Sequence, residues 1–262
     1  MDKNEKPIIS IVTVGMNHLN LIKSYLHSLY KKYLPSVSFE LIYVDNCSTD
    51  GSIDYIRDNY PLVEIIKNTS IEGFAHNNNK GVKKSKGEYI LFLNPDIILL
   101  PNCIDNLYNY LKDNKKIGIL VPKLLNFDLT PQESIRNFFT VRTLFQRLYL
   151  GSEKEGLISF DSEVIQQVDW AIGAAMLLSR DWYDNLKGFD ESYFLYVEDV
   201  DICLRSWKLG KPVFYFPESV FLHAHQKSSS NGWNRKRFLH IKSMIRFFTI
   251  HKIFLKSYSF TN

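Results

Sequence analysis

The stretch Glu88-Tyr-Ile-Leu-Phe-Leu-Asn-Pro-Asp96 decides the fold, because it describes a buried strand that runs directly into a carboxylate. Its apolar and aromatic run is typical of a strand that a parallel sheet buries on both faces. Pro95 has no N–H to donate and ends the ladder, which leaves Asn94 and Asp96 at the carboxyl end of the strand. Ligands of open α/β sheets bind beyond such ends, and two oxygen-bearing side chains there suit a hard divalent cation held largely through ligand phosphates. The alternative is a simple turn that leads into a helix near Pro101.

Strands and helices alternate along the first half of the chain. Apolar runs predict strands at 8–14, 39–44, 63–67 and 117–122, and spacing or capping residues predict helices at 19–33, 53–57 and 73–86. This alternation predicts an α/β fold, with a mostly parallel sheet flanked by helices on both faces. Asp45 ends the second strand, so Asp45 and Asp96 fall at the carboxyl ends of separate strands, as expected of a nucleotide pocket.

Bulk properties and missing motifs narrow the class of protein. The chain has 262 residues, 45% of them hydrophobic and 23% charged, which fits one large domain, or one domain with an appendage. Its three cysteines are far apart, which argues against a disulfide framework or a zinc site. The dinucleotide fingerprint, the Walker A loop and the Gly-x-Ser-x-Gly motif are absent. We see no signal peptide and no membrane-spanning run, so we expect a cytoplasmic protein without a nucleic-acid partner.

A second acidic cluster follows an aromatic run near the end of the chain. Glu198, Asp199 and Asp201 open a helix that we expect to end at Gly210, and Asp201 is spaced to pair with Arg205. All three acids could be helix caps, since the dipole favours negative charge at a helix N-terminus. Glu198 and Asp199 also follow three aromatic residues, and a carboxyl group walled by aromatics has its neutral form favoured and can serve as a base with a raised pKa.

Other segments could contribute to the same site. The segment 126–163 is poorly periodic, and we expect a loop-and-helix excursion where an acceptor could approach, with Arg136 as a surface residue. The small residues at 173–175 permit the close approach of a ligand or backbone, or alternatively tight helix packing. Two late strands, predicted at 213–216 and 220–222, lead to His223 and His225. Alternate residues of an extended segment point to opposite sides, so only one of the two histidines can face the pocket, and imidazole can complete a metal shell. The alternative for either histidine is a packed or surface residue.

The last part of the chain is basic. Residues 235–256 carry seven Lys or Arg and no Asp or Glu, while the whole chain has a net charge of +4, so the rest of the chain carries −3. Phe238, Ile241, Ile245 and Phe248 recur at helical spacing among these basic residues. The pattern predicts a C-terminal helical basic segment, residues 231–262, that either binds an anionic membrane surface through residues 235–256 or packs on the core.

These motifs together resemble glycosyltransferase family 2, the inverting transferases of the GT-A fold. The resemblance covers about residues 8–230, which we expect to form the GT-A domain. It is carried by Ile11–Asn17, by the Asp45-Asn-Cys-Ser-Thr-Asp-Gly-Ser52 loop, by Gly73–Gly81, by Leu93-Asn-Pro-Asp96, by the Glu198–Asp199 pair and by His223. Position 94 departs from the acidic residue of the family's metal motif, because it is Asn. The Leu-Asn-Pro-Asp, Val-Asp-Trp170 and Tyr-Val-Glu-Asp-Val-Asp201 segments look most like bacterial rhamnosyltransferases, which use dTDP-rhamnose to build cell-surface polysaccharides.

The resemblance implies a role for each site residue. Asp45 would accept a hydrogen bond from the pyrimidine N3–H. Thr13, Asn17, Asn79, Asn94, Trp170 and Gly173 would line the remainder of the nucleotide-sugar site. Asp96, helped by His223, would hold Mg²⁺ or Mn²⁺ on the diphosphate. Asp199, or its neighbour Glu198, would deprotonate the acceptor hydroxyl.

The resemblance also implies partners and leaves alternatives. The expected partners are a nucleotide-sugar donor and a lipid-linked glycan acceptor, reached by a protein peripheral to the inner face of the cell membrane. Within the family, the donor could instead be a UDP-linked galactofuranose, glucose or N-acetylglucosamine. Outside enzymes, the alternative is a catalytically silent nucleotide-sugar or glycan-binding module.

Overall fold

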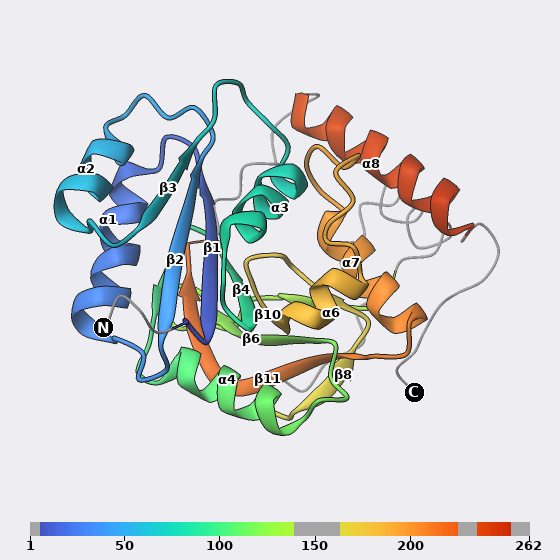
Figure 1. The fold of residues 1–262 in the computed structure, drawn as a ribbon. Coiled ribbons are helices and arrows are strands. Elements are labelled where there is room, and N and C mark those ends of the chain that lie inside the picture. The colour runs from blue at the N-terminus through green and yellow to red at the C-terminus, as the bar shows by residue number, and fades with distance from the viewer. Residues whose placement is uncertain (1–5, 139–162, 225–234, 253–262) are drawn as a thin grey trace.

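A computed structural model describes residues 6–138, 163–224 and 235–252 of the chain. They form an α/β fold around one large sheet whose strands lie in the order β3-β2-β1-β4-β10-β6-β11-β5, with β8 paired to β11 (Figure 1). The strands are β1 (Ile9–Gly15), β2 (Phe39–Asp45), β3 (Glu64–Lys67), β4 (Tyr89–Leu93), β5 (Ile97–Leu99), β6 (Ile119–Leu125), β8 (Gln166–Val168), β10 (Ala175–Ser179) and β11 (Val213–His223). A separate two-stranded sheet joins β7 (Ile135–Arg136) to β9 (Trp170–Ala171).

The predicted α/β fold is confirmed, and the sheet is mixed in its second half. Strands β3, β2, β1 and β4 run parallel to one another, as do β6 and β11. Strand β10 lies between these two groups and is antiparallel to both β4 and β6. Because β10 runs the other way, its first residues lie at the edge of the sheet where β4 ends, and Ala175 pairs with Leu93. The polar residues after β4 therefore meet the segment before β10.

Helices cover both faces of the sheet. Helix α1 (Leu19–His27), α2 (Ser52–Asn59) and α4 (Cys103–Asp113) bury apolar residues in one core cluster, and α3 (Phe74–Lys84), α6 (Arg180–Asn185), α7 (Glu198–Lys208) and α8 (Arg235–His251) in the other. The strands divide their side chains between these clusters, since Leu91 and Leu93 of β4 face the first and Ile90 and Phe92 the second. This explains why β4 is an unbroken apolar run.

Three local details differ from the sequence-based expectations. The helix expected at 19–33 continues beyond α1 as a π-helical turn, η1 (Ser28–Lys32). The two late strands are one strand, β11, whose register with β6 shifts between Phe216 and Val220. Residues 174 and 175 pack in the first core cluster, and Ala175 begins strand β10, so the small residues do not form a helix of their own.

The segment after Pro95 forms a strand before it forms a helix. Strand β4 ends at Leu93 as expected, but the chain next forms the short strand β5, and helix α4 begins only at Cys103. Strand β5 pairs with the end of β11 in antiparallel register, with Ile97 opposite His223. The Asn-Pro-Asp turn therefore connects two strands of the sheet, and this places it beside the last residue of β11.

Helix α8 lies beside α7, and His251 near its end donates to Asp201 in the first turn of α7 (Figure 1). Met244, Phe247 and Phe248 are buried in the second core cluster, whereas Phe238 and Ile245 are 65% and 63% exposed. The buried face of α8 therefore differs from the apolar face predicted from the sequence, and the two faces share only Phe248. Of the helices in the described residues, none is long and apolar enough to cross a membrane.

Candidate functional site

The carboxyl ends of β1 and β2 form the first part of the site. Asp45 and Thr13 are both fully buried. The Asp45 carboxylate accepts the backbone N–H of Ser48 at 3.2 Å, and the Thr13 hydroxyl lies 3.0 Å from the hydroxyl of Tyr25. Both side chains therefore have protein partners in this structure, and a nucleoside contact through Asp45 stays a prediction.

Asn17 is exposed and holds the two loops at this end together. Its backbone N–H donates to Ser48 Oγ at 2.9 Å, and its side-chain oxygen accepts the N–H of Thr49 at 2.8 Å. Asp50 adds a third connection, because its carboxylate accepts the N–H of Leu19 at 2.8 Å at the start of α1. The loop after β1 and the loop after β2 thus form one unit whose position is fixed by these polar side chains.

Asp96 and His223 come together through the pairing of β5 with β11. The backbone N–H of Ala224 donates to Asp96 O at 3.0 Å, and this places His223 Nε2 3.4 Å from Asp96 Oδ1. Both side chains are largely buried, at 18% exposed for Asp96 and 6% for His223. Asn94 is joined to the start of β10 by its backbone N–H, which donates to Ala174 O. The predicted association of Asp96 with His223 is therefore present, while His225 lies outside the described residues.

The donor set fits a divalent cation that is bound together with a diphosphate. Asp96 Oδ1 is buried and accepts no hydrogen bond from the described residues, so one carboxylate oxygen remains for a ligand. No cluster of three or more His, Cys, Asp or Glu able to hold a metal is found in the described ranges. Mg²⁺ is commonly held by one or two carboxylates together with substrate phosphates, and such a cation needs only a small set of protein ligands. Asp96 and His223 could supply that set.

Asp199 faces the segment before β10. Its Oδ2 accepts the backbone N–H of Gly173 at 3.0 Å, and its Oδ1 accepts the N–H of Val200 at 2.9 Å. A Cβ at position 173 would lie 3.4 Å from the Asp199 Cβ, so Gly173 permits this close approach. The side chain of Asp199 is half-buried. The pKa of Asp199 is raised above its ordinary value, because burial outweighs the two backbone N–H groups and the charge of Arg136, which act in the opposite direction.

Glu198 occupies a different environment from its neighbour. It is 5% exposed, and its Oε2 is buried without a hydrogen-bond partner among the described residues. Burial first, and then the charge of Asp199, raises its pKa well above the ordinary value of 4.5. The structure confirms the expected shift for Glu198. The pair therefore consists of a buried carboxyl group that favours its neutral form and a more accessible carboxylate.

We predict that Glu198→Gln stabilises the fold in a pH-dependent way. A carboxyl group whose pKa is raised by folding binds more protons in the folded state, so its contribution to stability is fully present below pH 4.5 and is lost as the pH rises through the raised value. Glutamine is neutral at every pH. The parent and the variant should therefore unfold alike in acid, and the variant should have the higher melting temperature at neutral pH, by about 2–4 °C for each kcal/mol gained.

Glu191→Gln is the matched control for this experiment. Hydrogen bonds from Asn79, together with His76, lower the pKa of Glu191 even though partial burial acts against them. A lowered pKa gives the opposite sign, with stability present above the unfolded-state pKa and lost in acid. This control variant should gain nothing at neutral pH. A Glu198→Gln variant no more stable than its parent at neutral pH would contradict the assignment of a neutral Glu198.

Arg136 is a site residue that the sequence interpretation placed on the surface. Arg136 lies on β7 and is half-buried. Its guanidinium lies 5.7 Å from the ring centre of Trp170 on β9. Its positive charge acts to lower the pKa of Asp199. The Trp170 indole donates to Asn137 O at 2.9 Å. The pairing of β7 with β9 thus brings a cation and an aromatic ring next to the carboxylate. No local pattern marks Arg136, because its neighbours come from a segment about thirty residues away in the chain.

Asn79 requires a correction. Its side-chain oxygen accepts the Tyr183 hydroxyl and the Phe189 N–H, and its side-chain nitrogen donates to Phe189 O and Glu191 Oε1. These four bonds use the full hydrogen-bonding capacity of the amide. Asn79 therefore joins α3 to the turn after α6, and the expected contact with a diphosphate or ribose is not available to it in this structure.

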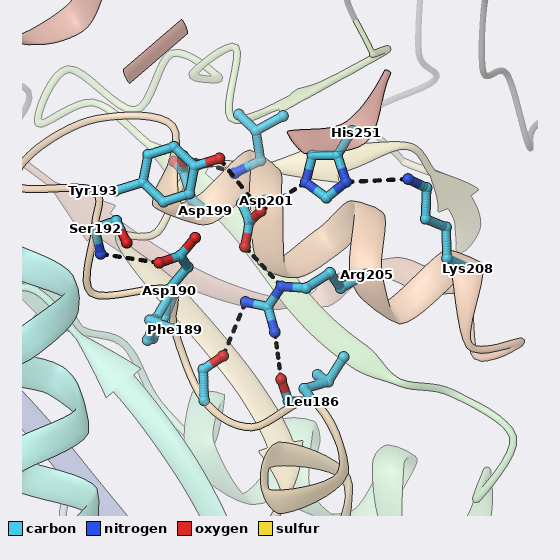
Figure 2. A network of polar contacts seen from close by, with 12 residues as sticks. Leu186, Phe189, Asp190, Ser192, Tyr193, Asp199, Asp201, Arg205, Lys208 and His251 are labelled. Atoms are coloured by element: carbon cyan, nitrogen blue, oxygen red, sulfur yellow. Dashed lines mark hydrogen bonds and ion pairs between the residues drawn. The ribbon is translucent and has the colours of Figure 1, made fainter. Parts of the chain in front are cut away.

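A polar network lies behind the acidic pair (Figure 2). Asp201 is buried and accepts hydrogen bonds from Arg205 Nε at 2.7 Å, as predicted from their spacing, and from His251 Nε2 at 2.7 Å. Lys208 Nζ lies 3.1 Å from His251 Nδ1. An ammonium group can only donate, so Nδ1 accepts and the proton of the neutral ring lies on Nε2. The network joins the first turn of α7 to the end of α8.

Three features together define a GT-A glycosyltransferase. They are the mixed α/β sheet, the Asp96–His223 pair with its donor set for a divalent cation, and the Asp199 carboxylate at the start of α7. The chain belongs to glycosyl transferase family 2, because the sequence model of that family, described as "Glycosyl transferase family 2", matches residues 10–168. The matched range runs from β1 to β8 and so contains the loops that hold Asn17, Asp45 and Asp96.

Two curated relatives are similar to this chain over most of its length. The chain is 27% identical over 263 residues to "Rhamnosyltransferase WbbL" of Escherichia coli (strain K12), covering 94% of each chain. It is 26% identical over 226 residues to "N-acetylglucosaminyl-diphospho-decaprenol L-rhamnosyltransferase" of Mycobacterium tuberculosis (strain ATCC 25618 / H37Rv), covering 77% of this chain and 73% of the relative. The protein is thus similar to rhamnosyltransferases of the family.

Solved structures share the fold. GalNAc-T7 with UDP, GalNAc and Mn²⁺ superimposes with a TM-score of 0.72 at 18% identity, over 95% of this chain and 48% of that one. The mannosyltransferase PcManGT from Pyrobaculum calidifontis, in complex with GDP-Man and Mn²⁺, gives 0.65 at 18% identity, over 97% and 67% of the two chains. This chain therefore spans about half the length of the first structure. Both neighbours contain a nucleotide and Mn²⁺.

Proposed function

We propose that the protein is an inverting rhamnosyltransferase, which moves L-rhamnose from dTDP-rhamnose onto a hydroxyl group of a lipid-linked glycan. The names of the two curated relatives support the sugar, and the decaprenol in one of those names supports the lipid-linked acceptor. The observation that carries the reaction type is Asp199, a half-buried carboxylate held by two backbone N–H groups beside Gly173.

Asp199 is proposed as the general base. A base must be within reach of the acceptor and must be ionised, and the N–H groups of Gly173 and Val200 stabilise the ionised form and fix its orientation. Asp199 would take the proton of the acceptor hydroxyl as its oxygen bonds to the anomeric carbon from the face opposite the leaving group. The bond from that carbon to the diphosphate breaks, and the configuration inverts. Glu198 is less exposed and is the second candidate.

The donor would lie along the sheet edge from β2 to β10. Asp45, Thr13 and Asn17 are proposed for the nucleoside end, and Asn94, Trp170 and Gly173 for the sugar end. Asp96 and His223 would hold Mg²⁺ or Mn²⁺, which neutralises the charge of the diphosphate as it leaves. The Mn²⁺ in the two structural neighbours supports this cofactor.

A panel of donors tests the proposal. Nucleoside diphosphate release would be measured from dTDP-rhamnose and from UDP- and GDP-sugars, with a prenyl-diphosphate-linked glycan as acceptor and with Mg²⁺, Mn²⁺ or EDTA. Release dependent on dTDP-rhamnose supports the donor. Selective release from a UDP-sugar, such as UDP-galactofuranose, UDP-glucose or UDP-N-acetylglucosamine, would overturn the donor and keep the reaction type. A protein that binds donors without turnover would be a binding module.

The outward face of α8 is proposed to meet an anionic membrane surface, where a lipid-linked acceptor resides. Phe238, Lys242 and Ile245 are exposed and follow one another at helical spacing, and the helix begins with Arg-Lys-Arg at 235–237. This proposal places the protein at the inner face of the cell membrane as a peripheral protein. The division into residues 1–230 and 231–262 is likewise a proposal, with α8 attached to the first unit through buried side chains.

We predict that Phe238→Ser with Ile245→Ser reduces flotation with vesicles that contain anionic phosphatidylglycerol. Burial of a large apolar side chain contributes about 1.5–3 kcal/mol, so the double variant should bind at least ten-fold more weakly. Leu62→Ser is the matched control, since Leu62 is 65% exposed far along the chain from α8. Equal flotation of parent and double variant, or no flotation of the parent, would exclude this surface.

A further inference from the structure

Behind the Asp96–His223 pair lies a glutamine that neither the sequence motifs nor the family likeness marks. Gln132 follows a tight turn after β6, where its backbone N–H donates to Leu124 O at 2.9 Å. Its side-chain nitrogen donates to His223 O at 2.8 Å and to Asn126 Oδ1 at 2.8 Å. Its side-chain oxygen lies 2.8 Å from His223 Nδ1. Gln132 thus contacts both the backbone and the ring of His223.

These contacts determine which way the amide of Gln132 faces. A backbone carbonyl oxygen can only accept, so the Gln132 atom 2.8 Å from His223 O must be the nitrogen. Both N–H bonds of that nitrogen are then used, one by His223 O and one by Asn126. The atom that faces His223 Nδ1 must therefore be the oxygen, which is an acceptor.

The orientation of Gln132 in turn fixes the tautomer of His223. Because Gln132 Oε1 can only accept, the ring nitrogen that faces it must carry the proton, so Nδ1 is the donor. In the neutral ring, Nε2 then carries a lone pair, and Nε2 is the atom that lies 3.4 Å from Asp96 Oδ1. Two electron-pair donors thus converge at a buried position where Asp96 Oδ1 accepts no hydrogen bond from the described residues.

We propose that Gln132 is a positioning residue for the divalent cation of this site, because it holds His223 in the Nδ1–H tautomer with Nε2 3.4 Å from Asp96 Oδ1. This inference rests on the proposed use of a cation in sugar transfer. Histidine ligands commonly donate their second ring N–H to an oxygen acceptor, which fixes the ring and raises its basicity, and loss of that acceptor typically weakens metal binding about 10–100-fold.

Mn²⁺ titration followed by electron paramagnetic resonance, in the presence of dTDP or UDP, tests the proposal. Methionine matches the length of glutamine without its hydrogen bonds, so Gln132→Met should weaken Mn²⁺ binding about 10–100-fold. Gln132→Glu keeps an acceptor for Nδ1–H but loses the N–H donors to His223 O and Asn126 Oδ1, so it should bind Mn²⁺ more tightly than Gln132→Met does. Gln167→Met, at an exposed glutamine on β8, should change nothing. Melting temperatures would show that each variant is folded.

A second measurement reports the tautomer directly. Nitrogen-15 spectra of the metal-free protein, assigned with His223→Ala, should show Nδ1–H for the parent and Gln132→Glu, and loss of that preference in Gln132→Met. Unchanged Mn²⁺ affinity in folded Gln132→Met, or an Nε2–H tautomer in the neutral ring of the parent, would overturn the proposal. A parent that binds no Mn²⁺ and transfers sugar fully in EDTA would also overturn it while leaving the transferase function intact. Gln132-dependent Mn²⁺ binding without transfer would uphold it and refute the function.

Discussion

Asp199→Asn should bind the nucleotide-sugar donor and lose transfer. The amide has the shape of the carboxylate, but it cannot take a proton from the acceptor hydroxyl. Removal of a positioned general base typically lowers the rate about 10²–10⁴-fold. We therefore expect kcat to fall by that factor while the dissociation constant of the donor, measured by calorimetry, stays within about three-fold. The loss should appear in kcat because Asp199 is proposed to act on the acceptor hydroxyl, while the nucleoside and diphosphate contacts are proposed for other residues.

Because Asp199 also makes hydrogen bonds, the experiment needs a stability measurement and a control Asp→Asn substitution away from the site. Asp199 Oδ2 accepts from Gly173, and an asparagine there could turn an N–H toward that backbone donor. Melting temperatures will show whether such a rearrangement destabilises the protein. Asp181→Asn removes an exposed carboxylate from α6 and should leave kcat unchanged. Turnover by Asp199→Asn within a few-fold of the parent would refute the assignment and would turn attention to Glu198.

Asp201→Ala should destabilise the protein by about 3–5 kcal/mol, because it breaks a buried ion pair by removing one partner. Asp201 accepts hydrogen bonds from Arg205 and His251, and its side chain is 2% exposed (Figure 2). Without it, the imidazole loses the acceptor of its Nε2–H, and the guanidinium keeps only the backbone carbonyl groups of Leu186 and Gly188. Chemical denaturation of the parent and the variant measures the loss. Hydrogen exchange should also show faster exchange in α8, which His251 connects to α7.

The surface pair of Asp54 and Arg57 gives the matched comparison. It has the same chemistry at 3.0 Å, but the two side chains are 74% and 64% exposed. Exposed ion pairs of this kind contribute about 0–1 kcal/mol, so Asp54→Ala should be close to neutral. If Asp201→Ala and Asp54→Ala proved equally mild, the network in Figure 2 would not be what secures α8 to the start of α7.

Local patterns in the sequence predict the individual elements of this fold well. The run that ends at Asp96 gives β4 with its observed bounds, because a strand buried on both faces needs apolar residues at every position. The start of α7 is also predicted from the sequence, because the helix dipole favours acidic residues in the first turn of a helix. Both predictions depend only on neighbours within a few residues. The positions of Asp96 and Asp199 at element ends follow from them.

The pairing of distant segments is what the sequence does not show. Strand β10 enters the sheet antiparallel between β4 and β6, and β5 pairs with the end of β11, which brings His223 to Asp96. The contacts of Gln132 with His223 depend on that register as well. For Asn79 the sequence predicted a contact that the structure does not show. Its motif indicated a ligand contact, but its amide is hydrogen-bonded to other protein groups. A single sequence holds no record of such long-range contacts.

The anomeric configuration of the product tests the central claim most directly. The parent protein would be incubated with dTDP-rhamnose, Mn²⁺ and a prenyl-diphosphate-linked glycan, and the new glycosidic bond would be examined by nuclear magnetic resonance. A single carboxylate base beside the acceptor predicts a product whose anomeric configuration is opposite to that of the donor. A product with retained configuration would contradict the proposed role of Asp199 and the mechanism built on it.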